Sequence, residues 1–235
     1  MTLAVIENLT SRPSAHRAIK NYRAMAKGYD GTCTRIEELR WATVQALALQ
    51  PGETVLDVAC GTGPALPLLC ELVGPAGRVV GIELSPEMAA LARSRVAAQA
   101  SCGNVTVLQT AMADIDASDK ADAVLMCYAH DVLQSEASID RLLAAAKPGA
   151  RIALAGMQTL PWLWGWPVNV FNLYRARRYL TTYANMDCPW RLLSVRGARL
   201  RQVRTALWGN AYLVVGTLPN AWSSGFLIVI SLVLP

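Results

Sequence analysis

Apolar residues in this chain alternate between two patterns, short β-branched runs and longer amphipathic stretches. The short runs include residues 54–59 and 78–83, and such runs are typical of strands buried on both faces of a parallel sheet. A helix-start signal at residues 85–87, Ser-Pro-Glu, combines a capping serine with a first-turn proline and an acid near the positive helix end. The alternation over residues 54–156 predicts βαβ units and an α/β, doubly wound sheet. The predicted helices are residues 14–27, 35–50, 63–73, 85–99 and 135–146.

The C-terminal part changes pattern. Residues 200–208 and 211–217 flank Gly209-Asn210, and two strand-like runs around such a dipeptide predict a hairpin. Residues 226–235 are almost free of charge but too few to span a bilayer. They could add an edge strand, dock on an apolar groove, touch a membrane, or be a non-native extension.

The length of 235 residues suits one domain with a full core, and no Pro/Ser-rich linker divides the chain. We predict a single domain over residues 1–218. Residues 1–34 would supply an N-terminal cap helix, and residues 157–199 an insertion over the active site. Residues 219–235 would form an apolar tail that is dispensable for binding and catalysis.

A glycine turn follows the first predicted strand. Gly61 and Gly63 permit positive φ and close approach of a ligand to the backbone, and the free N–H groups of the next helix face that ligand. Glu83 ends the second strand, where a carboxylate can accept both hydroxyls of a ribose. Leu66 occupies the position of the third glycine in the dinucleotide fingerprint, which argues against NAD. The pattern therefore predicts a different nucleotide-type cofactor.

The sequence Asp57-Val-Ala-Cys-Gly-Thr-Gly63 resembles the first motif of the class I S-adenosylmethionine-dependent methyltransferases. Residues 122–128 are similar to that family's fourth strand, and residues 142–151 to the segment entering its fifth. The resemblance covers about residues 35–160 and is closest to small-molecule enzymes near the ubiquinone and menaquinone C-methyltransferases. It implies a Rossmann-like seven-stranded sheet of order 3-2-1-4-5-7-6, with the last strand antiparallel and helices on both faces.

The resemblance also implies the cofactor, S-adenosylmethionine, and a set of residues around it. Tyr22 and Tyr29 resemble an N-terminal segment that covers the cofactor in many relatives, or they pack an N-terminal helix. Ala111 stands where the family often has an adenine-binding acid, so Asp114 either contacts adenine or caps a turn. The expected cofactor-binding residues are Tyr22, Tyr29, Asp57, Ala59, Gly61, Thr62, Gly63, Glu83, Leu84, Met112, Ala113 and Cys127.

The candidate catalytic residues are His130 and Asp131, which follow the fourth strand close to the expected methyl position. His130 would act as a base toward the acceptor, with Asp131 orienting it or capping a helix. A structural role for the histidine is the alternative.

Three tryptophans within five residues mark the insertion. In a doubly wound sheet an insertion at this point can roof the ligand site. Trp162, Trp164 and Trp166 therefore line a pocket for an apolar or aromatic acceptor, or they pack the insertion onto the core. Tyr128 is a further candidate substrate contact, and Arg175 would hold an anionic group or a membrane surface.

Charge and cysteine usage narrow the function. The net charge is +5, and arginines cluster late in the chain, as an RNA methyltransferase would need for phosphate contacts. However, no N/D-P-P-Y/F/W motif, with which base-methylating enzymes of this fold usually grip a flipped base, follows the fourth strand. We therefore expect a small-molecule acceptor (quinone-like, phenolic, lipid or secondary metabolite) and no nucleic acid; a non-catalytic binding protein is the other alternative. Six scattered cysteines without a C-x-x-C pair predict no metal site. No secretory signal is recognisable, so we expect reduced thiols and a cytoplasmic location.

Overall fold

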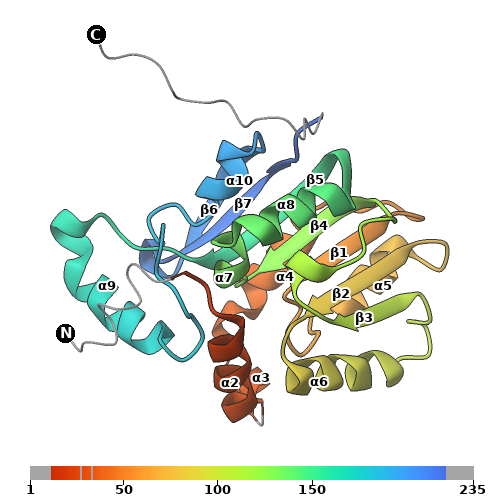
Figure 1. The fold of residues 1–235 in the computed structure, drawn as a ribbon, viewed down its shortest axis with the longest axis horizontal. Coiled ribbons are helices and arrows are strands. Elements are labelled where there is room, and N and C mark those ends of the chain that lie inside the picture. The colour runs from red at the N-terminus through yellow and green to blue at the C-terminus, as the bar shows by residue number, and fades with distance from the viewer. Residues whose placement is uncertain (1–11, 27, 33, 221–235) are drawn as a thin grey trace.

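A computed structural model describes residues 12–26, 28–32 and 34–220 of the chain (Figure 1). A seven-stranded sheet with the strand order β3-β2-β1-β4-β5-β7-β6 forms its centre, which confirms the predicted order. The strand β7 is antiparallel to both of its neighbours, and β6 and β7 form the predicted hairpin. The strands are β1 (Thr54–Val58), β2 (Arg78–Glu83), β3 (Val105–Gln109), β4 (Ala121–Cys127), β5 (Ala146–Met157), β6 (Arg199–Ala206) and β7 (Ala211–Thr217).

Helices cover both faces of the sheet, because the central strands are apolar on both faces. Val55 and its same-face neighbours pack against α4 (Glu37–Ala46), α5 (Leu66–Val73) and α6 (Pro86–Ala97). Leu56 and Val58 point to the opposite face, toward α7 (His130–Leu133), α8 (Glu136–Ala145) and α10 (Arg191–Val195). Because successive side chains of a strand point to opposite faces, the sheet has a hydrophobic core on each face.

The carboxyl ends of the parallel strands meet at one edge of the sheet. Val58 of β1 pairs in register with Ile82 of β2 and with Met126 of β4. The chain leaves β1 toward β2 on one side and reaches β4 on the other, so this edge is a topological switch point. The residues that follow these strands therefore lie close together.

Two segments lie outside this layered body (Figure 1). The helix α2 (Ala15–Met25), followed by the short α3 (Tyr29–Thr32), crosses the edge where β1 and β4 end, and Arg23 pairs with Glu87 of α6 at 2.6 Å. The helix α9 (Trp162–Ala176) projects beside the sheet within the insertion, where no helix was predicted. Three 3₁₀ turns complete the described elements: η1 (Thr34–Ile36), η2 (Met112–Asp114) and η3 (Leu207–Gly209).

The described chain continues two residues past residue 218, where we expect the domain to end. The backbone N–H of Gly149 donates to the carbonyl of Pro219 at 3.2 Å, so contacts with the sheet continue past Leu218. Most of the predicted tail, residues 221–235, lies outside the described residues. In the part of the chain that the structure describes, no helix is long and apolar enough to cross a membrane.

Candidate functional site

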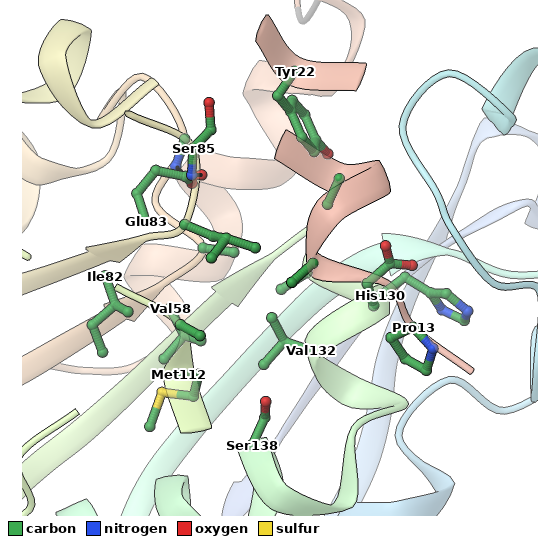
Figure 2. Close-up of a pocket in the computed structure, with 18 of the residues that line it drawn as sticks. Pro13, Tyr22, Val58, Ile82, Glu83, Ser85, Met112, His130, Val132 and Ser138 are labelled. Carbon is green, nitrogen blue, oxygen red and sulfur yellow. Dashed lines mark hydrogen bonds between the residues drawn. The ribbon is translucent and has the colours of Figure 1, made fainter. Parts of the chain in front are cut away.

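A cavity of about 280 Å³ opens at the carboxyl ends of β1, β2 and β4 (Figure 2). Its floor is apolar and includes Val58, Ile82 and Met112, while the helix α2 forms a wall across it. The cavity thus lies where ligands bind in doubly wound sheets. The predicted site residues that line it are Tyr22, Tyr29, Ala59, Gly61, Glu83, Leu84, Met112, Ala113, Cys127, Tyr128, His130 and Asp131.

Glu83 is held in one orientation at the end of β2. Its Oε2 atom accepts a hydrogen bond from the backbone N–H of Gly61 at 2.9 Å, and its Oε1 atom accepts one from the N–H of Ser85 at 2.7 Å. Burial raises the pKa of this carboxyl, whereas the N–H groups of Ser85 and Gly61 lower it. Each oxygen keeps a lone pair for a further donor. The arrangement fits a ligand with two adjacent hydroxyls, such as a ribose.

The glycine turn leaves room for that ligand. Gly61 has a φ of 60°, and a Cβ atom added there would meet nothing within 4 Å. Ala59 also has a positive φ, 58°, which is costly for a residue with a Cβ atom and indicates a tightly constrained turn. The open backbone at Gly61 beside the Glu83 carboxylate fits S-adenosylmethionine, whose nucleoside would lie against both.

Asp57 does not line the cavity, contrary to the expectation. It alternates with Leu56 and Val58 along β1, so it belongs to the opposite face of the sheet from Val58, which lines the cavity. It is buried, and burial raises its pKa to about 7, with the Arg40 charge opposing and Glu83 adding to the shift.

Thr62 and Gly63 also do not line the cavity, because they contact α3, α5 and α6 on the other side of the glycine turn. The Thr62 hydroxyl donates to Oδ1 of Asp30 at 2.5 Å, and Arg95 binds both the Thr62 carbonyl, at 2.9 Å, and Asp30. A Cβ atom at Gly63 would lie 2.8 Å from Leu66 Cδ1 and 3.1 Å from the Cβ of Ala92. These residues dock α3 and α6 onto the turn; they are not expected to touch a ligand.

The N-terminal wall combines apolar and aromatic side chains. Ala18, Ile19 and Tyr22 of α2 face the cavity, and Tyr22 packs edge-on against Tyr29 with 5.9 Å between ring centroids. Tyr29 packs in the same way against Tyr179, at 6.3 Å. The two predicted tyrosines therefore both line the cavity and pack on each other, and they connect α2 with the chain that follows α9.

The residues that follow β3 form a further part of the cavity lining. Thr110, Ala111, Met112 and Ala113 line the cavity, whereas Asp114 is exposed and does not. No acid among these residues reaches the cavity, so any contact with an adenine amino group falls to the backbone or to other side chains. Sequence analysis did not identify several other lining residues, and only Ser85 carried a signal there, as a predicted helix cap. These residues are Pro13, Ser14, Ser85, Ser135, Ser138, Tyr179 and Leu180.

His130 lies at the end of the cavity remote from Glu83, with its ring beside Pro13 (Figure 2). Burial lowers its pKa to about 4, and the nearby Ala184 backbone opposes this shift, although neither ring nitrogen has a hydrogen-bond partner among the described residues. The imidazole is therefore neutral near pH 7 and is a weak base. Cys127 nearby is a thiol and not a thiolate, because burial raises its pKa to about 12.

Asp131 does not orient His130, which corrects the expected pair. Its carboxylate accepts hydrogen bonds from the backbone N–H of Thr181, at 3.0 Å, and from the Thr181 hydroxyl, at 2.7 Å. The same hydroxyl accepts the backbone N–H of Ser14 at 2.9 Å. Asp131 thus joins α7 to the insertion and, through Thr181, to the start of α2.

The three tryptophans of the insertion do not line the cavity, which corrects a second expectation. Trp162, Trp164 and Trp166 are 52%, 63% and 58% exposed on α9. Arg175 is exposed as well, with its guanidinium 5.7 Å from the centroid of the Phe171 ring. The helix α9 turns Gly165, Asn169, Leu173 and Ala176 toward the protein, and it turns the tryptophans and Arg175 toward solvent. Only the chain after α9, at Tyr179 and Leu180, reaches the cavity.

Comparisons with known proteins agree with this geometry. Residues 55–149 match the family described as "Methyltransferase domain". A demethylmenaquinone methyltransferase from Symbiobacterium thermophilum is 36% identical over 107 residues, 43% of this chain and 41% of that protein. An arsenite methyltransferase from Halobacterium salinarum is 32% identical over 117 residues, 48% of this chain and 30% of that protein. The chain thus spans less than half the length of these curated relatives.

A solved structure has the same fold. The S-adenosylmethionine-dependent methyltransferase from Aquifex aeolicus superposes with a TM-score of 0.56 and 24% identity, over 76% of this chain and 89% of that one. Residues 55–149 thus match a methyltransferase domain, and the fold around them is the one seen in S-adenosylmethionine-dependent methyltransferases. Less than half of the chain is similar to the ubiquinone and menaquinone C-methyltransferase group, the group that the first motif resembles.

Proposed function

We propose that this protein transfers the methyl group of S-adenosylmethionine to a small acceptor that is mainly apolar or aromatic. The observation that carries the proposal is the continuous cavity from Glu83 and Gly61, at one end, to His130 and Leu180 at the other. The bound cofactor supplies a methyl group already activated on a sulfonium. Glu83 and the Gly61 backbone would hold its nucleoside, and α2 would exclude water from the reacting groups.

The acceptor end of the cavity supports the apolar class. Ala18, Ile19, Val132 and Leu180 line it, and the hydroxyls of Ser135 and Ser138 are available for orientation. Neither lysine nor arginine is among the described residues that line the cavity, and the Asp131 carboxylate is engaged by Thr181. Phosphate groups of a nucleic acid would find no cationic partner inside, which disfavours the RNA methyltransferase alternative.

Titration calorimetry with S-adenosylmethionine and its demethylated product tests the cofactor assignment. Glu83→Ala should weaken cofactor binding by about 1.5–3 kcal/mol, because hydrogen bonds to a charged group are lost. Glu71→Ala, an exposed acid on α5, is the matched control and should bind as the wild type does. Equal affinities of the folded Glu83→Ala variant and the wild type would overturn the assignment.

A radiolabelled-methyl screen over quinone, phenol, lipid and tRNA extracts then tests the transfer. Label in the quinone, phenol or lipid fractions supports the proposal, and label in tRNA alone would replace it with the RNA alternative. Tight cofactor binding without transfer to any fraction would indicate a non-catalytic binding protein.

A further inference from the structure

The helix α9 has two faces of opposite character. Gly165, Asn169, Leu173 and Ala176 recur at helical spacing and are buried. Asn169 fixes this face, because its side chain accepts the N–H of Leu160 at 2.8 Å and donates to the Leu160 carbonyl at 2.9 Å. The helix is therefore anchored in one rotational setting, which determines what it presents outward.

The outward face of α9 is apolar and aromatic. Of the fourteen exposed large hydrophobic side chains among the described residues, seven lie on this one helix. Leu163 is 94% exposed and Phe171 58%. So many exposed large apolar side chains on one helix are uncommon on a monomeric protein and mark an interaction site. The seven are Trp162, Leu163, Trp164, Trp166, Val168, Phe171 and Tyr174, here called the α9 face.

The charged residues at the C-terminal end of α9 are all arginines. Arg175 and Arg178 are exposed, and Arg177 lies over the Tyr174 ring, with its guanidinium 3.6 Å from the centroid. None of these arginines forms a salt bridge within the described part of the chain. Aspartate and glutamate are absent from the sequence between Asp140 and Asp187. The helix therefore offers tryptophan, tyrosine and phenylalanine beside unpaired positive charge.

We infer that α9 seats the protein on an anionic membrane surface, which goes beyond the proposed function and does not depend on it. Tryptophan and tyrosine favour the interface between headgroups and acyl chains, and arginines beside them attract anionic lipids. The helix lies on the bilayer and does not cross it. Because the chain leaving α9 lines the cavity at Tyr179 and Leu180, the docked helix places the cavity next to the lipid.

Sedimentation of the full-length protein with vesicles tests the inference. The wild type should bind vesicles of phosphatidylcholine with one-third phosphatidylglycerol and bind pure phosphatidylcholine vesicles far more weakly. Arg175→Gln/Arg178→Gln should weaken binding to the anionic vesicles about 30-fold, from the usual contribution of two cations near such a surface. Leu163→Ser/Trp164→Ser/Phe171→Ser should abolish binding.

Matched variants separate the helix from general charge and hydrophobicity. Arg199→Gln/Arg201→Gln removes two exposed arginines of β6, and Trp41→Ser removes a tryptophan of α4 that is 48% exposed. Both should bind anionic vesicles as the wild type does, and thermal unfolding should show that every variant is folded. Undiminished binding in the α9 variants would overturn the inference. The inference would also be overturned if the wild type formed dimers through the α9 face and did not bind vesicles, since that face would then be a protein interface.

Discussion

At the scale of single residues, His130 is the side chain whose role depends most on its surroundings. Its low pKa of about 4 keeps it neutral over the physiological range. If it accepts the acceptor's proton, His130→Ala should lower kcat by roughly 10²-fold or more and leave cofactor affinity nearly unchanged. Steady-state kinetics with the acceptor found by the methyl screen, together with calorimetry, measures both quantities. Unchanged kcat would leave His130 a structural residue.

Asp57 should make stability depend on pH. Its pKa is about 7 in the folded protein and near 4 in the unfolded chain, so the folded state binds more protons between these values. The contribution of Asp57 to the free energy of unfolding is therefore highest below about pH 4, where the carboxyl is protonated in both the folded and the unfolded state. This stability is lost as the pH rises through 7. Asp57→Asn should therefore stabilise the protein at pH 8, by up to about 4 kcal/mol, and much less at pH 4.5.

Urea unfolding at both pH values measures this difference. Asp114→Asn, which removes an exposed carboxyl, is the control and should change stability little at either pH. If Asp57→Asn destabilised the protein at pH 8, the attraction between the ionised Asp57 and Arg40 would outweigh the cost of burying the charge.

At the scale of elements, the contact between Asp131 and Thr181 joins α7, the insertion and the start of α2. Asp131→Ala removes the carboxylate that accepts from the Thr181 N–H and hydroxyl, which should cost about 1–3 kcal/mol. Amide hydrogen exchange should accelerate at Thr181 and also at Ser14, whose N–H donates to the Thr181 hydroxyl.

Asp187→Ala provides the comparison, because this exposed carboxylate pairs with Arg191 on the surface. It should leave exchange at Ser14 unchanged. If Asp131→Ala did the same, the three segments would be held together by other contacts.

At the scale of the whole molecule, the N-terminal segment covers the site without belonging to the core. The helix α2 has no buried residue, yet it forms a wall of the cavity and is tied to α6 by Arg23 and Glu87. A chain that starts at Gly28 should keep its far-UV circular dichroism and cooperative unfolding. Its affinity for S-adenosylmethionine should fall at least about tenfold, since one wall of the cavity is lost. Loss of the cooperative transition would show instead that α2 is part of the folding unit.

The sheet was predictable because its signals are local. Residues 54–59 and 78–83 show strand character by themselves, and the hairpin around Gly209 and Asn210 follows from turn chemistry. The strand order came from the resemblance of the first motif to a known family. Within the site, Glu83 and Gly61 were predicted because a strand end and a glycine turn fix their place in the cavity.

Contacts between distant segments were not predictable in the same way. The sequence by itself determined the layered α/β architecture and the end of the cavity formed by Gly61 and Glu83, because periodicity and turn residues act over short distances. Only the tertiary structure decided that Asp57 points away from the cavity, that Asp131 binds Thr181, and that Trp162, Trp164 and Trp166 face solvent. Each of these depends on which face of an element packs against the rest, and that choice is made by residues far away in the chain.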